Sequence, residues 1–145
     1  MPSRRNYPAT VQEVLDPALT FKPAALRAVR AFARSKPWRG SLSRRKDTFR
    51  RLNRELAAAY CTAEPRLVFQ GIEGGTGSGD SSYRLATHTI TLVGKLSVVT
   101  FLHEFAHARG FDERQACHWS INLFRRCFPR SFARCRRVGH TLVRD

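Results

Sequence analysis

The sequence predicts a single α+β domain, and three observations support this prediction. The chain has 145 residues, which suits one domain, and 42% of them are apolar, including ten Phe and two Trp, enough to form a core. Helical spacing of apolar residues dominates the first 64 positions. Short strand-like segments come next and further helical segments follow them, so helices and strands are segregated along the chain.

We expect three parts along the chain. Residues 1–20 are predicted to be an irregular N-terminal segment, with at most one turn of helix. Residues 21–137 are predicted to form the domain, in which 21–64 are helical and basic and 65–128 contain the strands and the helices of the site. Residues 138–145 are predicted to be a C-terminal tail.

Two helices are predicted in the basic part. The first begins near Pro23, where a missing N–H costs least, and Pro37 ends it. The second follows Ser43. Its apolar stripe consists of Phe49, Leu52, Leu56 and Tyr60, and arginines occupy its other faces. The arginines predict either a solvated outer face or a surface for phosphates or acidic partners.

Three strands are predicted at 67–70, 83–86 and 89–93. The loop between the first two, 71–82, contains five glycines, but it has no G-K-[ST] ending and opens no helix, so it is not a phosphate loop. In 89–93 Thr alternates with Ile, Leu and Val, which is typical of a strand with one buried face.

The net charge of +15 is distributed unevenly. Residues 1–66 carry 15 basic and 5 acidic side chains, 67–108 carry two and three, and 109–145 carry nine and three. The flanks are therefore basic and the centre is nearly neutral. Basic flanks favour nucleic acid as a partner, but an electrostatic binder has no need of a neutral centre.

The sequence predicts a cytoplasmic location. It has no run of 18 apolar residues, and residues 1–5 lead into no apolar stretch, so neither a membrane span nor a secretory signal is expected. The four cysteines form no C-x-x-C pair, which argues against a zinc ribbon or a redox pair. We expect them to be reduced, semi-buried thiols.

The neutral centre contains the motif that carries chemistry. Ser97 is predicted to cap an apolar helix that contains His103-Glu104-Phe105-Ala106-His107. Histidines four residues apart lie on one helical face, so His103 and His107 can bind one Zn²⁺. Glu104 is placed to act as general base on zinc-bound water. Two core histidines bonded to backbone are the structural alternative.

A catalytic zinc needs a third protein ligand and an open position. Gly110 is predicted to end the helix in the left-handed conformation. Asp112 and Gln115 then form a capping-box pattern that begins a second helix. Glu113 falls on the face of that helix that turns back to the first, and it is the predicted third ligand; Asp112 and His118 are the alternatives.

The string from His103 to Glu113, H-E-x-x-H-x-x-G-x-x-E, resembles the zincin metallopeptidases. It is similar to the metzincin spacing, although a Glu stands in place of the usual histidine and no Met-turn follows. The closer resemblance is to the intracellular ImmA/IrrE-like zincins, with the SprT-like proteases more distant. In the ImmA/IrrE group Glu-x-x-Ala-Asn supplies the third ligand; here Glu113 and Ala116 match, and Cys117 replaces the Asn.

The resemblance covers about residues 83–129 and implies a zincin-like fold. Such a fold has a small, mostly antiparallel sheet packed on the active-site helix, flanked by further helices. A substrate peptide would lie along the edge strand, for which 89–93 is the candidate. A side-chain donor would assist the reaction, and Tyr83, His88 and His140 are unranked candidates.

The expected function is that of an intracellular zinc peptidase with one catalytic Zn²⁺ and a restricted protein substrate. Its metal ligands would be His103, His107 and Glu113, and its general base Glu104. The alternative is a basic nucleic-acid-binding or DNA-associated protein whose zincin fold keeps the metal and has lost catalysis. No membrane partner is expected.

Overall fold

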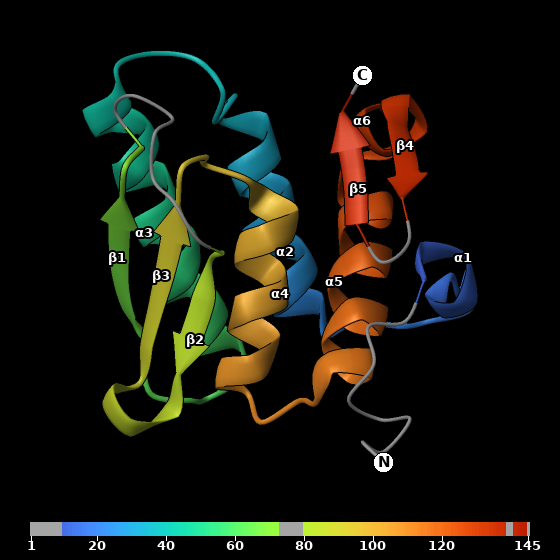
Figure 1. Cartoon of the computed structure of the whole chain (residues 1–145), viewed down its shortest axis with the longest axis horizontal. Coiled ribbons are helices and arrows are strands. Elements are labelled where there is room, and N and C mark those ends of the chain that lie inside the picture. Colours follow the sequence, from blue (N-terminus) through green and yellow to red (C-terminus); the bar gives the residue numbers. More distant parts are fainter. Residues whose placement is uncertain (1–9, 73–79, 139–140, 145) are drawn as a thin grey trace.

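The computed structural model describes residues 10–72, 80–138 and 141–144, and in this part the chain forms one mixed α and β domain (Figure 1). The loop glycines between 73 and 79, His140 and most of the first ten residues lie outside the described residues. The helices are α1 (Val11–Val14), α2 (Pro23–Arg34), α3 (Leu42–Ala59), α4 (Val98–Ala108), α5 (Glu113–Cys127) and α6 (Pro129–Arg134). The strands are β1 (Arg66–Gln70), β2 (Ser82–Arg84), β3 (Thr89–Val93), β4 (Cys135–Val138) and β5 (Thr141–Arg144).

The main sheet has the strand order β1-β3-β2 and is mixed. β1 and β3 are parallel over five residue pairs, whereas β2 and β3 are antiparallel over three. The expectation of a mostly antiparallel sheet is therefore wrong, because the connection from β1 returns through β2 before β3 begins. The second predicted strand, 83–86, is also shorter than expected: it ends at Arg84, because Leu85–Thr87 form a 3₁₀ turn.

Residues 89–93 form the central strand, so their prediction as the edge is wrong as well. Ile90 and Leu92 are fully buried and the residues between them are half-buried, as the alternation predicts. Alternation reports which face of a strand is buried and says nothing about which strands pair beside it. The free edge next to α4 belongs to β2 instead (Figure 1).

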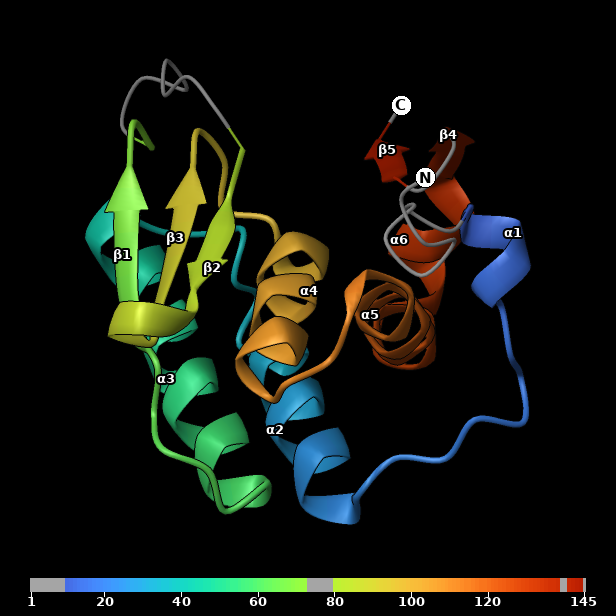
Figure 2. The ribbon, with the colours of Figure 1, turned by 60° about the horizontal axis from the view of Figure 1, so that its bottom comes forward.

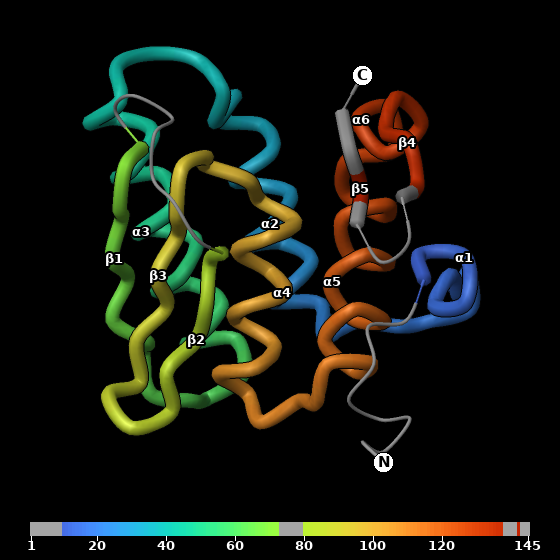
Figure 3. Tube along the Cα trace, in the orientation of Figure 1, coloured from blue at the N-terminus to red at the C-terminus, as the bar shows by residue number. Residues whose placement is uncertain are grey.

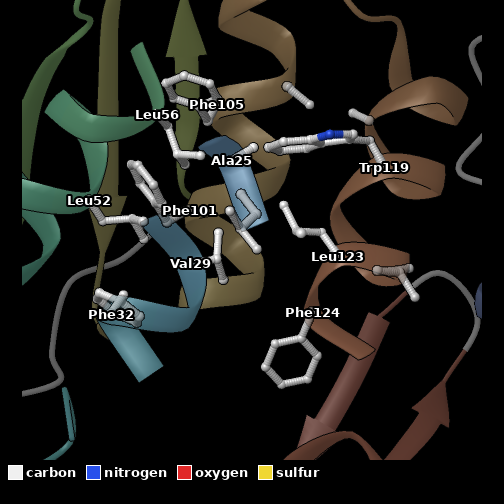
Figure 4. Close-up of a cluster of buried hydrophobic side chains, with 14 of the residues drawn as sticks. Ala25, Val29, Phe32, Leu52, Leu56, Phe101, Phe105, Trp119, Leu123 and Phe124 are labelled. Carbon is white, nitrogen blue, oxygen red and sulfur yellow. The ribbon is translucent and has the colours of Figure 1, made fainter. Parts of the chain in front are cut away.

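The helices pack in two layers around α4 (Figure 2). α4 lies between the sheet and α5, while α3 lies under the sheet and α2 under α4. Figure 4 shows the core that these helices share, in which Phe101 and Phe105 of α4 are fully buried. The Phe101 ring meets Phe49 of α3 edge-on at 5.9 Å, and the Phe105 ring stacks on Trp119 of α5 at 6.2 Å.

The two ends of the described chain pack on the outer side of α5 (Figure 3). The predicted single turn of helix near the N-terminus is present as α1, whose Val11 and Val14 are buried. Asn122 of α5 fixes this segment, because its amide donates to the Val14 carbonyl at 2.7 Å and accepts from Asp16 N at 2.9 Å. Part of the predicted tail, residues 138–145, is structured: Thr141–Arg144 form β5, which pairs antiparallel with β4, and α6 precedes these two strands.

Within the described ranges, none of the helices is both long and apolar enough to span a bilayer. The four cysteines range from buried Cys117 to exposed Cys61, and Cys127 and Cys135 are half-buried. The expectation of semi-buried thiols is therefore wrong for Cys61 and Cys117.

Candidate metal centre

The helix α4 positions the two motif histidines on one face. Ser97 caps it, accepting a hydrogen bond from Thr100 N at 3.3 Å. The four-residue spacing turns the imidazoles of His103 and His107 toward each other, with ring centroids 4.8 Å apart. Their Nε2 atoms lie 3.1 Å apart, and both side chains are about one-fifth exposed. The histidines are therefore at the margin of the core, where a ligand can reach them.

The turn after α4 orients His107. Gly110 adopts φ +91°, which places its N–H on the carbonyl of His107 at 2.9 Å and Phe111 N on that of Ala106 at 3.1 Å. These two bonds are the Schellman pattern that ends many helices. The turn brings the Phe111 carbonyl to 2.9 Å from His107 Nδ1. Because a carbonyl only accepts, Nδ1 donates this bond, which leaves Nε2 as the free lone pair.

The start of α5 delivers Glu113. The predicted capping box is present: Gln115 N donates to Asp112 Oδ1 at 2.8 Å and Asp112 N donates to Gln115 Oε1 at 3.0 Å. The first helical residue is then Glu113, whose Oε1 contacts His103 Nε2 and lies 3.5 Å from His107 Nε2. Of the three candidates for the third ligand, the structure brings Glu113 to the histidines. Asp112 caps the helix, and His118 is paired with Asp16 at 3.2 Å.

The donor set fits a zinc ion. Two tetrahedral ligands at about 2.0–2.1 Å from Zn²⁺ are separated by roughly 3.3 Å. The distances of 3.1 Å between the Nε2 atoms and 3.5 Å from His107 Nε2 to Glu113 Oε1 bracket that separation. The third pair, His103 and Glu113, is in closer contact. Behind the site, His103 Nδ1 lies 3.8 Å from the Sγ of Cys117, so both imidazoles have a partner on the side away from the centre.

The carboxyl of Glu104 lies beside this centre. Ligand atoms of His103, Glu104 and His107 all fall within 4.8 Å of one another. Glu104 is only 6% exposed, and its buried Oε2 has no hydrogen-bond partner among the described residues. A buried polar atom without a partner is costly, so its presence in an otherwise apolar helix favours a role toward a ligand.

The pKa of Glu104 is raised to about 7, and burial is the largest cause. The negative charges of Glu113 and Asp80 contribute to this rise, whereas the interaction with His107 opposes it. Asp80 is exposed and stands at the end of the glycine-rich loop, just before β2. The sequence gives no sign of this proximity, because the position of Asp80 depends on the pairing of the adjoining strand β2 with β3.

Two of the three candidate donors are bonded to each other. His88 Nε2 lies 2.9 Å from the Ala63 carbonyl and therefore donates to it. His88 Nδ1 then accepts the bond from the Tyr83 hydroxyl at 2.7 Å. The hydroxyl proton of Tyr83 is therefore engaged in a hydrogen bond to His88. The third candidate, His140, lies outside the described residues.

Comparison of the chain with protein-family models, curated proteins and solved structures finds no match. Two imidazole nitrogens and one carboxylate oxygen can hold a divalent cation, and a buried carboxyl beside them can exchange a proton with a molecule bound there.

Proposed function

We propose that the protein is a zinc-dependent metallopeptidase that hydrolyses peptide bonds in a restricted protein substrate. One observation carries the proposal: His103, His107 and Glu113 converge on one point, and the partnerless carboxyl of Glu104 lies next to it. Structural histidines would account for the hydrogen bond to Phe111. They would not account for a buried carboxyl left without a partner at the same place.

The residues that would hold the metal are His103, His107 and Glu113. When bound there, Zn²⁺ supplies a Lewis acid that makes a coordinated water more acidic and polarises a peptide carbonyl. Glu104 accepts the proton that the attacking water loses and returns it to the amine that leaves when the C–N bond breaks. Burial raises the pKa of this carboxyl above its ordinary value, which helps it to hold the proton between the two transfers.

The free edge of β2 is the proposed place for the substrate backbone. β2 lies between β3 and α4, and its second edge pairs with no strand of the described chain (Figure 1). An extended peptide can add to such an edge through main-chain hydrogen bonds. The strand has only three residues, Ser82–Arg84, so few such bonds can form. A short edge fits a peptidase whose substrate is selected by further contacts.

Metal content and peptide cleavage, measured together, test this function. Protein purified without chelator should contain about one zinc per chain. In a peptide library read by mass spectrometry, Glu104→Gln should lower the cleavage rate by about 10²–10⁴-fold while the zinc content stays the same. Glu64→Gln is the matched control, because it makes the same change at an exposed carboxyl. Zinc-free wild-type protein, with the histidines intact, would overturn the proposal.

The alternative functions predict different results. A zincin fold that keeps its metal without catalysis predicts one zinc in both proteins and cleavage in neither. A nucleic-acid-binding role for the basic flanks predicts binding of DNA or RNA that weakens steeply as salt rises. That role concerns a different surface and does not depend on Glu104.

A further inference from the structure

A hollow of about 760 Å³ lies away from the metal centre, where the ends of α3 and α4 meet the starts of α2 and α5. Its walls include the aromatic side chains Phe21, Tyr60, Phe111 and Trp119. Its volume is in the range of small-molecule sites, about 300–1,000 Å³. Neither Asp nor Glu lines it in the described part of the chain.

The central feature of this hollow is Arg109. Its guanidinium lies 3.6 Å above the ring of Tyr60, 4.6 Å from that of Phe111 and 5.4 Å from that of Trp119. All three distances are within the range of cation–π contacts, about 6 Å. No hydrogen bond or ion pair joins the guanidinium to any described residue, unlike that of Arg44, which donates to three backbone carbonyls.

The cation–π contacts leave the hydrogen-bonding capacity of Arg109 unused. They hold the guanidinium in place without consuming any of its five N–H donors. A half-buried guanidinium that is held in this way and keeps its donors is suited to bind an oxyanion in a bidentate manner.

A second cation stands at the same hollow. Lys22 lines it, with Nζ 5.6 Å from the Tyr60 ring and 3.3 Å from the Ala59 carbonyl, to which it donates. That bond uses one of three ammonium donors and leaves two. His118 lies on the wall as well, and its Asp16 partner does not line the space. The lining therefore combines aromatic rings with the positive charges of Arg109 and Lys22.

We propose that this hollow binds a small anionic molecule, whose phosphate or carboxylate group is held by Arg109 and Lys22 and whose apolar part lies against the aromatic walls. The proposal is independent of the peptidase function, since it uses no group of the metal centre. It also differs from diffuse attraction by a charge of +15, because it assigns the affinity to one fixed guanidinium.

Trp119 offers a direct test, since it lines the hollow and the chain has only one other tryptophan, Trp38. In a Trp38→Phe background, the full chain as purified is titrated with inorganic phosphate and, separately, with succinate. Ionic strength is held constant with sodium chloride, and Trp119 fluorescence is recorded. We expect a saturable change with a Kd of about 1 mM or lower for at least one anion. The tighter of the two identifies the group that the site prefers.

Variants decide whether Arg109 is responsible. Arg109→Lys keeps the charge but loses the paired N–H donors that allow bidentate binding, and it should weaken binding about tenfold. Arg109→Gln should abolish saturation, and Arg54→Gln, which removes the same charge from an exposed site on α3, should leave the Kd unchanged. Lys22→Gln, at an exposed side chain, should weaken binding severalfold and serves if the Arg109 variants fail to fold. No saturable change, or equal loss in Arg54→Gln, would overturn the proposal.

Discussion

The helices α3 and α4 are in contact through Phe49 and Phe101, but their polar side chains differ in exposure. On α3 the charged side chains face solvent and pair within the helix, as Arg50 does with Asp47 and Arg51 with Glu55. On α4 the polar residues of the motif are buried or half-buried and turn toward one point. An exposed charge is solvated by water and needs no binding partner. A polar group buried in an apolar helix does need one. The near-neutral α4 is therefore the better guide to function than the arginine-rich α3.

The first prediction concerns the apolar side of this contact. Phe101 is fully buried between Phe49 and Phe105. Phe101→Ala should lower the free energy of unfolding by about 3–5 kcal/mol, because it removes a large side chain and leaves a cavity. Urea unfolding of the metal-free protein measures the loss. A cost below about 1 kcal/mol would mean that α4 is not anchored to α3 as the packing indicates.

The second prediction concerns the polar side of α4. Glu113→Ala should weaken zinc binding by about 100-fold or more, which exceeds the usual effect of a residue that only supports a ligand. Competition with a chelator measures the affinity. Asp112→Ala is the matched control: it removes the helix cap and about 1 kcal/mol of stability but should leave zinc affinity unchanged. The reverse pattern would assign the third ligand to Asp112.

Local sequence patterns predicted the site better than they predicted the sheet. The caps at Ser97 and Asp112, the turn at Gly110 and the approach of Glu113 all depend on residues within a few positions, and the structure has each of them. Strand order depends on pairing between distant segments. The central place of β3, and the nearness of Asp80 to Glu104 that follows from it, left no local signal.

Two element boundaries also differ from the prediction, one at the start of α3 and one near the C-terminus. The second helix begins at Leu42, because Ser41 accepts a hydrogen bond from Arg44 N and so caps it earlier than the predicted Ser43. The sequence predicted a tail over residues 138–145, whereas Thr141–Arg144 form β5, which pairs with β4. Short strands rich in arginine carry little hydrophobic alternation, so pairing with each other is what defines them.

The third prediction tests how the turn supports the site. Gly110→Ala places a side chain at φ +91°, where nothing lies within 4 Å, so its cost is backbone strain alone, about 1–2 kcal/mol. Relief of that strain would move the Phe111 carbonyl from His107, and we expect zinc affinity to fall about tenfold. Gly40→Ala is the control, at φ +93° and far from the metal centre in the sequence; it must also displace Arg44, which donates to three backbone carbonyls. It should lose at least as much stability and no affinity for zinc.

The smallest expected effect returns to α3. Arg51 is 72% exposed and pairs with Glu55 one turn away. Arg51→Gln should change the free energy of unfolding by no more than about 0.5 kcal/mol, because solvent and salt already screen the pair. Zinc affinity and cleavage should not change either. Thermal unfolding at low and high salt checks the first claim, and chelator competition the second. A large loss of either kind would show that the arginines of α3 support the metal centre, and the contrast between the two helices would no longer hold.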